Sequence, residues 1–257
     1  MSNLIFSLNA TMPIFLTMIL GLFFRKVGIL DESFTSKMNK FVFKIALPVL
    51  LFQDLSDSDF SAVWDIKFVL FCFFATLLSI LAVWGLSHLL KERSARGEFI
   101  QAAYRSSAAI FGIAFIQNIY GEAGMGPLMI VASVPLYNIM AVVVLTVMRP
   151  ERGRINGALI RKTLHGIITN PIIVGILTGV VWSVLKLPMP VILEKTVKNV
   201  AVLATPLGSA TTDSSYVMAR NMGHKGVLTS SVVMMTTLLS AFTLTGWLYL
   251  LKVQGLI

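Results

Sequence analysis

The chain has 257 residues, of which 56% are hydrophobic and only 13% are charged. Soluble domains carry about twice that charged fraction, and apolar runs long enough to cross a bilayer recur from end to end. This composition excludes a soluble globular protein and predicts one all-α, polytopic membrane domain over residues 1–257. The net charge of +9 fits basic cytoplasmic loops, since lysine and arginine gather there in membrane proteins. We therefore expect no nucleic-acid partner.

The first predicted span, residues 4–24, ends at the basic pair Arg25–Lys26, which places the N-terminus outside. It lacks the charged start and the cleavage pattern of a signal peptide, so we expect it to remain in the protein. The second span, residues 39–52, is short for a bilayer and contains Pro48, which removes a backbone hydrogen bond. We therefore expect this span to be broken.

The connector after the second span is acidic and carries Asp54, Asp57, Asp59 and Asp65. Its charge fits the outer face of the membrane. An acidic patch of this kind can bind a cation, but it is more often a plain solvated loop. The third span, residues 68–90, is followed by a cluster of basic residues, so the chain is then back in the cytoplasm.

The fourth span, residues 102–121, begins with a polar cluster of Arg105, Ser106 and Ser107. Polar groups at membrane depth cost several kcal/mol unless they face protein or a wet cavity, so this span should face inward. Gly112 allows the helix to loosen where carriers bind solutes. The alternative is a packing face of small residues. We place Arg105 at the cytoplasmic end of this helix, where it either attracts an anion or only snorkels to the interface.

The fifth span, residues 127–148, contains Asn138 near its middle, where an amide is costly unless it faces a partner or a cavity. A basic loop follows and returns the chain to the cytoplasm. The sixth span begins at Asn170, a natural N-cap, with Pro171 in the first turn. It continues to Leu185.

The segment over residues 191–223 is too polar for a lipid-facing helix, and Asp213 lies in it among serines and threonines. An intramembrane carboxylate is a functional-site hypothesis by default, because a proton or a cation relieves the cost of its charge. In the alternative interpretation, Asp213 caps the helix that enters Tyr216. The last span covers residues 227–251. The single cysteine and the three histidines have no partners at metal-ligand spacing, so we expect no metal. An intramembrane enzyme would need a nucleophile–base pair or metal ligands, and the sequence has no HExxH motif and no convincing paired carboxylates, so we expect no enzyme and no cofactor.

Five motifs in a fixed order resemble the auxin efflux carrier family, many of whose bacterial members are described as malate permeases or organic-acid transporters. The resemblance covers nearly the whole chain. The motifs are NKFVFKIALPVLLF (39–52), YRSSAAIFGIAF (104–115), VASVPLYNIMAVVVL (131–145), NPIIVGILTG (170–179) and SSYVMARNMG (214–223).

The resemblance implies a secondary carrier of ten helices in two inverted repeats, in which the fourth and ninth helices break and cross at the substrate site. It also implies an elevator-type movement. This chain is shorter than the members of the family generally are, and it lacks the sequence that corresponds to the eighth helix. We therefore expect about eight spans with both termini outside, a first repeat over residues 1–148 and a shortened second repeat over residues 166–257.

By this resemblance the protein is a permease for a small organic anion, such as a dicarboxylate, in the cell membrane. The alternative is an internally deleted relative that no longer transports. A homodimer is left open. Asp213 is the candidate for the coupling ion, a proton or sodium, and the candidate substrate-binding residues are Arg105, Ser106, Ser107, Gly112, Asn138, Ser214, Ser215 and Tyr216.

Overall fold

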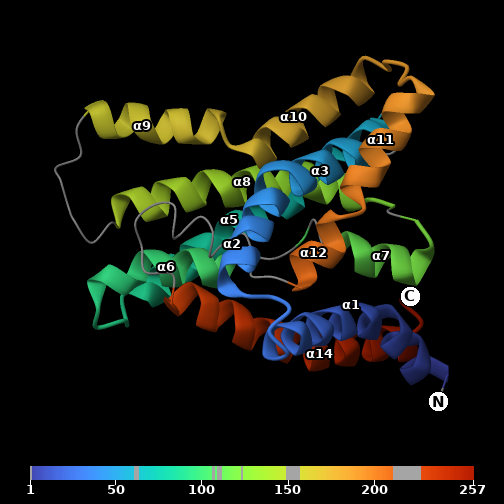
Figure 1. Ribbon diagram of the computed structural model, residues 1–257, viewed down its shortest axis with the longest axis horizontal. Coiled ribbons are helices and arrows are strands. Elements are labelled where there is room, and N and C mark those ends of the chain that lie inside the picture. Colours follow the sequence, from blue (N-terminus) through green and yellow to red (C-terminus); the bar gives the residue numbers. More distant parts are fainter. Residues whose placement is uncertain are drawn as a thin grey trace.

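The computed structural model describes residues 2–60, 64–105, 108, 112–122, 124–148, 157–210 and 227–257, and the regular elements in these ranges are all helices. Most of them lie lengthwise in one bundle (Figure 1). Within the described residues, α1, α5 and α8 are long and apolar enough to cross a membrane. The elements are α1 (Ser2–Lys26), α2 (Glu32–Phe41), the π-helix η1 (Val42–Ala46), α3 (Leu47–Ser56), α5 (Ile66–Ser87), α6 (Arg93–Tyr104), α7 (Ile113–Tyr120), α8 (Gly126–Val147), α9 (Gly157–Ile168), α10 (Pro171–Val184), α11 (Val191–Ala201), α12 (Ala204–Ala210) and α14 (Val227–Val253).

The break predicted at Pro48 is absent, because α2, η1 and α3 follow one another without interruption. In the π-turn just before Pro48, the N–H of Leu47 donates to the carbonyl of Val42, five residues earlier. Such a turn adds one residue and lets the chain pass the proline without losing its helical course. At 1.5 Å per residue the whole run is about 37 Å long, which is enough to cross a bilayer.

Helices α3 and α10 touch through their backbones at two glycines of α10. A Cβ atom at Gly175 would lie 2.5 Å from the carbonyl oxygen of Pro48, and one at Gly179 would lie 2.8 Å from that of Phe52. The successive contacts advance in the same direction along both helices, so α3 and α10 run parallel. The loop charges require the same, since they direct both spans from the inside to the outside.

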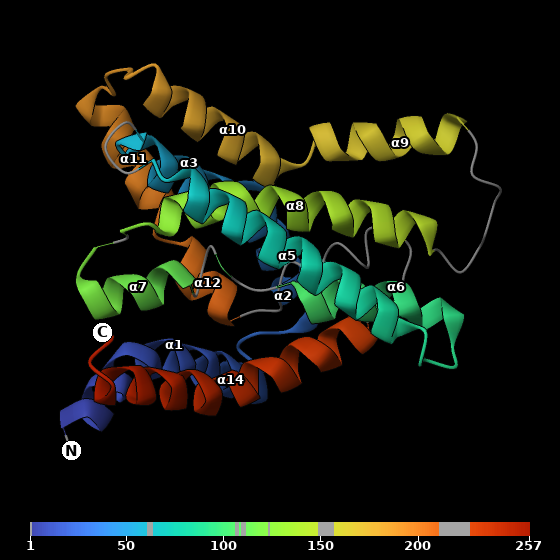
Figure 2. The same ribbon diagram turned by 180° about the vertical axis from the view of Figure 1, so that it is seen from behind.

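Helices α1 and α14 also lie side by side, but in opposite directions. The hydroxyl oxygens of Thr11 and Thr245 are 2.9 Å apart, and the ammonium of Lys252 lies 4.4 Å from the ring centroid of Phe6. The two termini therefore lie at the same end of the bundle (Figures 1 and 2). This arrangement agrees with the expectation that both termini are on one side of the membrane.

The predicted start of the sixth span is a junction between two helices. Asn170 caps α10 as expected, because its side-chain oxygen accepts from the N–H of Ile172 at 3.0 Å. However, α10 is only 14 residues long, about 21 Å, which is too short to cross alone. Helix α9 occupies part of the stretch in which the sequence predicts a basic loop, and it lies end to end with α10 in both views (Figures 1 and 2).

The packed core joins α3, α8 and α10, where it includes Leu51, Leu55, Leu128, Leu145 and Ile176. The outward faces of the bundle are also apolar. On α5, for example, Phe71 and Leu78 are each 69% exposed. This pattern fits helices whose outer surface is covered by lipid rather than by water.

We predict that Gly175→Ala lowers the stability of the protein by about 1–3 kcal/mol, because the added methyl group overpacks the contact with Pro48. The matched control is Gly246→Ala in α14, where a Cβ atom meets nothing within 4 Å and the change should be neutral or stabilising. Thermal unfolding of both variants in detergent measures the difference. Equal stability of the two would show that the close approach is not required.

Candidate functional site

The chain leaves the helix at Arg105, whereas the residue pattern predicts loosening at Gly112 and the family resemblance implies a broken fourth helix. Helix α6 ends at Tyr104, Arg105 is extended with φ −77° and ψ 119°, and helical geometry is present again at Ala108 and at Gly112, ahead of α7. Since α6 begins at Arg93, about 18 Å of helix precedes Arg105. The location of Arg105 at the cytoplasmic end of the fourth span stays a prediction.

The guanidinium of Arg105 is held by the amide of Asn138 on α8. Its Nη2 donates to Asn138 Oδ1 at 3.2 Å, and Asn138 Nδ2 donates to the carbonyl of Val134 at 2.8 Å. Asn138 is completely buried, whereas Arg105 is half-buried. The amide near the middle of the fifth span thus has a partner, as predicted. A guanidinium has five N–H donors in a fork that matches a carboxylate, so this pair can present a cationic group to an organic anion.

A tyrosine pair fixes the end of α6 on α8, next to this contact. The hydroxyl of Tyr104 donates to the carbonyl of Tyr137 at 3.0 Å, and the two rings stack with centroids 6.0 Å apart. Since Tyr104 and Tyr137 directly precede Arg105 and Asn138, the ring contact positions both residues of the polar pair.

Helix α6 carries two buried polar residues that the sequence pattern does not predict as site residues. Glu98 is 5% exposed, and its Oε2 accepts from the backbone N–H and the hydroxyl of Thr229 on α14, each at 3.4 Å. Gln101 is completely buried, and neither of its amide atoms has a hydrogen-bond partner. The basic residues around them predict a cytoplasmic loop between the third and fourth spans. The three-residue spacing of Glu98 and Gln101, next to the apolar Ile100 and Ala102, is the sequence signal that favours a helix here.

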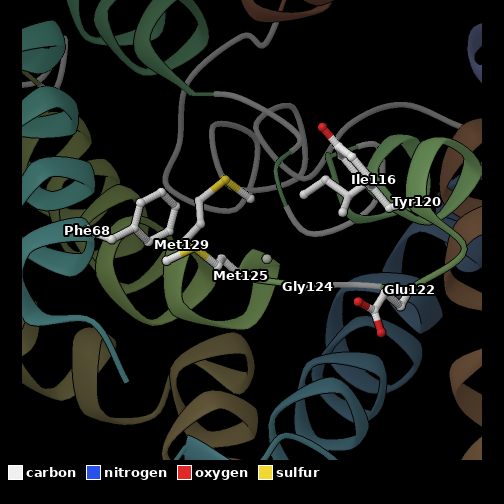
Figure 3. Close-up of a pocket in the computed structure, with 8 residues that line it drawn as sticks. Phe68, Ile116, Tyr120, Glu122, Gly124, Met125 and Met129 are labelled. Atoms are coloured by element: carbon white, nitrogen blue, oxygen red, sulfur yellow. The ribbon is translucent and has the colours of Figure 1, made fainter. Parts of the chain in front are cut away.

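Gly112 lies elsewhere, beside a cavity at the start of α8. A Cβ atom added at Gly112 would lie 3.5 Å from the terminal methyl of Met129. Met129 is about 13 Å from Asn138 along α8. The cavity has a volume of about 390 Å³, with Met125 and Met129 on one wall and Ile116 and Tyr120 on the facing wall (Figure 3). Its lining is Phe68, Ile116, Tyr120, Glu122, Gly124, Met125, Gly126 and Met129. This mostly apolar lining, with a carboxylate, does not suit an anion.

The structure thus brings Arg105 and Asn138 together and places Gly112 apart from them. The other candidates lie outside the described residues: Ser106, Ser107, Asp213, Ser214, Ser215 and Tyr216. Helix α12 ends at Ala210, just before the second group, and packs on α1 and η1. Within the described ranges, no group of three or more histidine, cysteine or acidic residues could hold a metal ion.

The acidic connector contains one residue that is not simply solvated. Helix α3 continues past the apolar stretch that ends at Phe52 and carries Asp54 against its neighbours. Asp54 is half-buried, and its Oδ2 is enclosed without a hydrogen-bond partner. The expectation of a plain solvated loop is therefore wrong for this aspartate.

A comparison with protein families identifies the family of the chain. The family model described as membrane transport protein matches residues 6–214, most of the chain, including α6, Arg105 and all of α8. No curated protein matches the chain significantly. The resemblance to the auxin efflux carriers is therefore confirmed at the level of the family. The chain belongs to the membrane transport protein family of the auxin efflux carriers and is a transporter homologue, not an enzyme.

Proposed function

We propose that the protein is a secondary active transporter of a small organic anion, such as a dicarboxylate, across the cell membrane. The observation that carries this proposal is the guanidinium of Arg105, which is held by Asn138 where the helix breaks after α6. Charged groups within membrane segments are expensive and mark substrate or ion pathways. A carboxylate at this guanidinium would form charge-assisted hydrogen bonds and so offset part of the cost.

We propose eight crossings for this transporter, which the helix directions support. They are α1, α2–η1–α3, α5, α6–α7, α8, α9–α10, α11–α12 and α14. The first five make a repeat over residues 1–148, and the last three make a shortened inverted repeat over residues 166–257. The short α11 and α12, of 11 and 7 residues, motivate the alternative of an internally deleted relative that does not transport.

The remaining sequence candidates enter the proposal by their place in the chain. Ser106, Ser107 and Gly112 follow Arg105 at the first break, and Ser214, Ser215 and Tyr216 follow α12. Asp213 is the proposed site for a coupling proton or sodium ion, since a carboxylate within a membrane segment gains most from a cation.

We predict that both termini are outside. The loop charges place the N-terminus there, and α14 returns the C-terminus to the same end of the bundle. A reporter that is active only on one side of the membrane, fused after Ile257, measures the location. A cytoplasmic C-terminus would contradict the eight crossings.

We predict that the purified protein takes up labelled dicarboxylates in proteoliposomes and that Arg105→Ala lowers kcat/KM by ~10–100-fold, the value of a charged hydrogen bond. Arg105→Lys should recover only part of this, since lysine lacks the planar fork. The matched control is Lys44→Gln, which removes an exposed basic residue. In the same assay, Asp213→Asn should alter the pH or sodium dependence if Asp213 binds the coupling ion.

Two results would decide against parts of this proposal. If both Arg105 variants keep the affinity of the parent, the guanidinium does not contact the substrate. If the parent takes up no dicarboxylate and no other small organic anion, the alternative of a transport-inactive relative is the correct one.

A further inference from the structure

The side chain of Gln101 on α6 is completely buried, yet neither its amide nitrogen nor its amide oxygen has a hydrogen-bond partner. Buried polar groups in folded proteins are nearly always paired, and an unpaired one costs free energy, more so in a membrane where no water is at hand. An amide that is kept without partners in one state of a transporter is therefore expected to find them in another.

Gln101 lies on a row of polar residues along one face of α6. Glu98 precedes it by three residues and Arg105 follows it by four. Residues at these spacings are neighbours on a helix surface, with Cβ atoms ~5–6 Å apart. A short molecule with two carboxyl groups can therefore reach Arg105 with one end and Gln101 with the other.

The two ends of such a molecule would meet different chemistry. Arg105 offers only donors and a positive charge, which suits an ionised carboxylate. Gln101 is neutral and offers both a donor and an acceptor. A protonated carboxyl group also has one donor and one acceptor, so it can form two parallel hydrogen bonds with the amide, whereas a carboxylate would leave the amide oxygen without a donor.

Glu98 adds a further reason against a second carboxylate at this position. It is one turn from Gln101 on the same face, and a like charge disfavours ionisation of a neighbouring group. Glu98 is the only carboxylate on α6 and on the described parts of the helices that pack against it, α5, α8 and α14. The ionisable side chains of those three helices are Lys67 and Cys72 on α5, Tyr137 on α8, and Tyr249 and Lys252 on α14, with His88 directly after α5.

We propose that the substrate binds as the monoanion of a dicarboxylic acid, with its carboxylate on Arg105 and its protonated carboxyl group on the amide of Gln101. This inference rests on the proposed function and makes Gln101 a specificity-determining residue. The dianion takes up one proton from solution on one side of the membrane, and the monoanion releases it on the other side. The substrate thus carries a proton in addition to any ion at Asp213.

The proposal requires a state in which Gln101 is open, because α14 packs on α6 through Thr229 and Glu98 in the described conformation. Transporters of alternating access move one group of helices against another around the binding site. Movement of α14 away from α6 would open the polar row.

The test compares succinate with succinamate, its monoamide, whose second end is neutral at every pH and keeps both a donor and an acceptor. In proteoliposomes of the full chain, the KM for total succinate should rise about tenfold per pH unit above its second ionisation. Succinamate should compete with labelled succinate with an inhibition constant that does not change over the same range. Gln101→Met, of similar length, should weaken both ligands by ~10–100-fold while raising the melting temperature, since it removes an unpaired amide.

Gln101→Leu serves as a second variant. If neither variant folds, the pH dependence of KM and the competition by succinamate in the parent decide the proposal. A KM for succinate that is independent of pH, or succinamate that fails to compete, would overturn the proposal. Unchanged affinities in Gln101→Met would overturn the assignment of this residue. These outcomes differ from a failure of the proposed function, in which the parent takes up no labelled succinate at any pH.

Discussion

Every polar group between membrane helices must find a partner within the protein, because the hydrocarbon core supplies none. This constraint explains much of the structure. Hydroxyl groups along the helices donate to carbonyls one turn earlier, as Thr11 does to Ser7 and Thr178 to Val174. The amide of Asn138 bonds to its own helix and to Arg105. Within the described residues, Gln101 is completely buried and neither of its polar atoms has a partner. It departs from the constraint, and the proposed role in binding substrate accounts for that departure.

The backbone is subject to the same constraint where prolines and breaks interrupt it. At Pro48 a π-turn keeps the chain helical, and the close contact with Gly175 covers that stretch of backbone. At Asn170 a side-chain cap replaces the missing helical bond. At Arg105 the chain leaves the helix, so the interruption there is a true break. The arrangement combines a closely packed pair, α3 and α10, with a fourth span that is not continuous, as expected if a fixed frame supports a binding site.

The charge distribution separates two environments along α8. At one end the cavity beside Met125 and Met129 is apolar and carries Glu122, which is unfavourable for an anion. Near the middle, Asn138 holds the guanidinium of Arg105. The proposed anion site is therefore at Arg105 and not at this cavity. In our proposal, the row formed by Glu98, Gln101 and Arg105 distinguishes an ionised end of a substrate from a neutral one.

The sequence by itself determined the features that depend on local composition and periodicity. Apolar runs predicted a helical membrane protein, the motifs indicated its family, and the cap at Asn170 followed from a few adjacent residues. Loop charges predicted helix directions that agree with the packing of α3 on α10 and α1 on α14.

Only the tertiary structure decided which polar groups meet. Arg105 and Asn138 are 33 residues apart, and Glu98 and Thr229 are 131 apart, so no local pattern could pair them. The same holds for the burial of Asp54 and for the inclusion of α6 in the bundle, both of which the sequence assigned to loops because charged residues surround them. A charge indicates a loop only when water is its best partner, and the packing of distant helices decides whether a better partner is present.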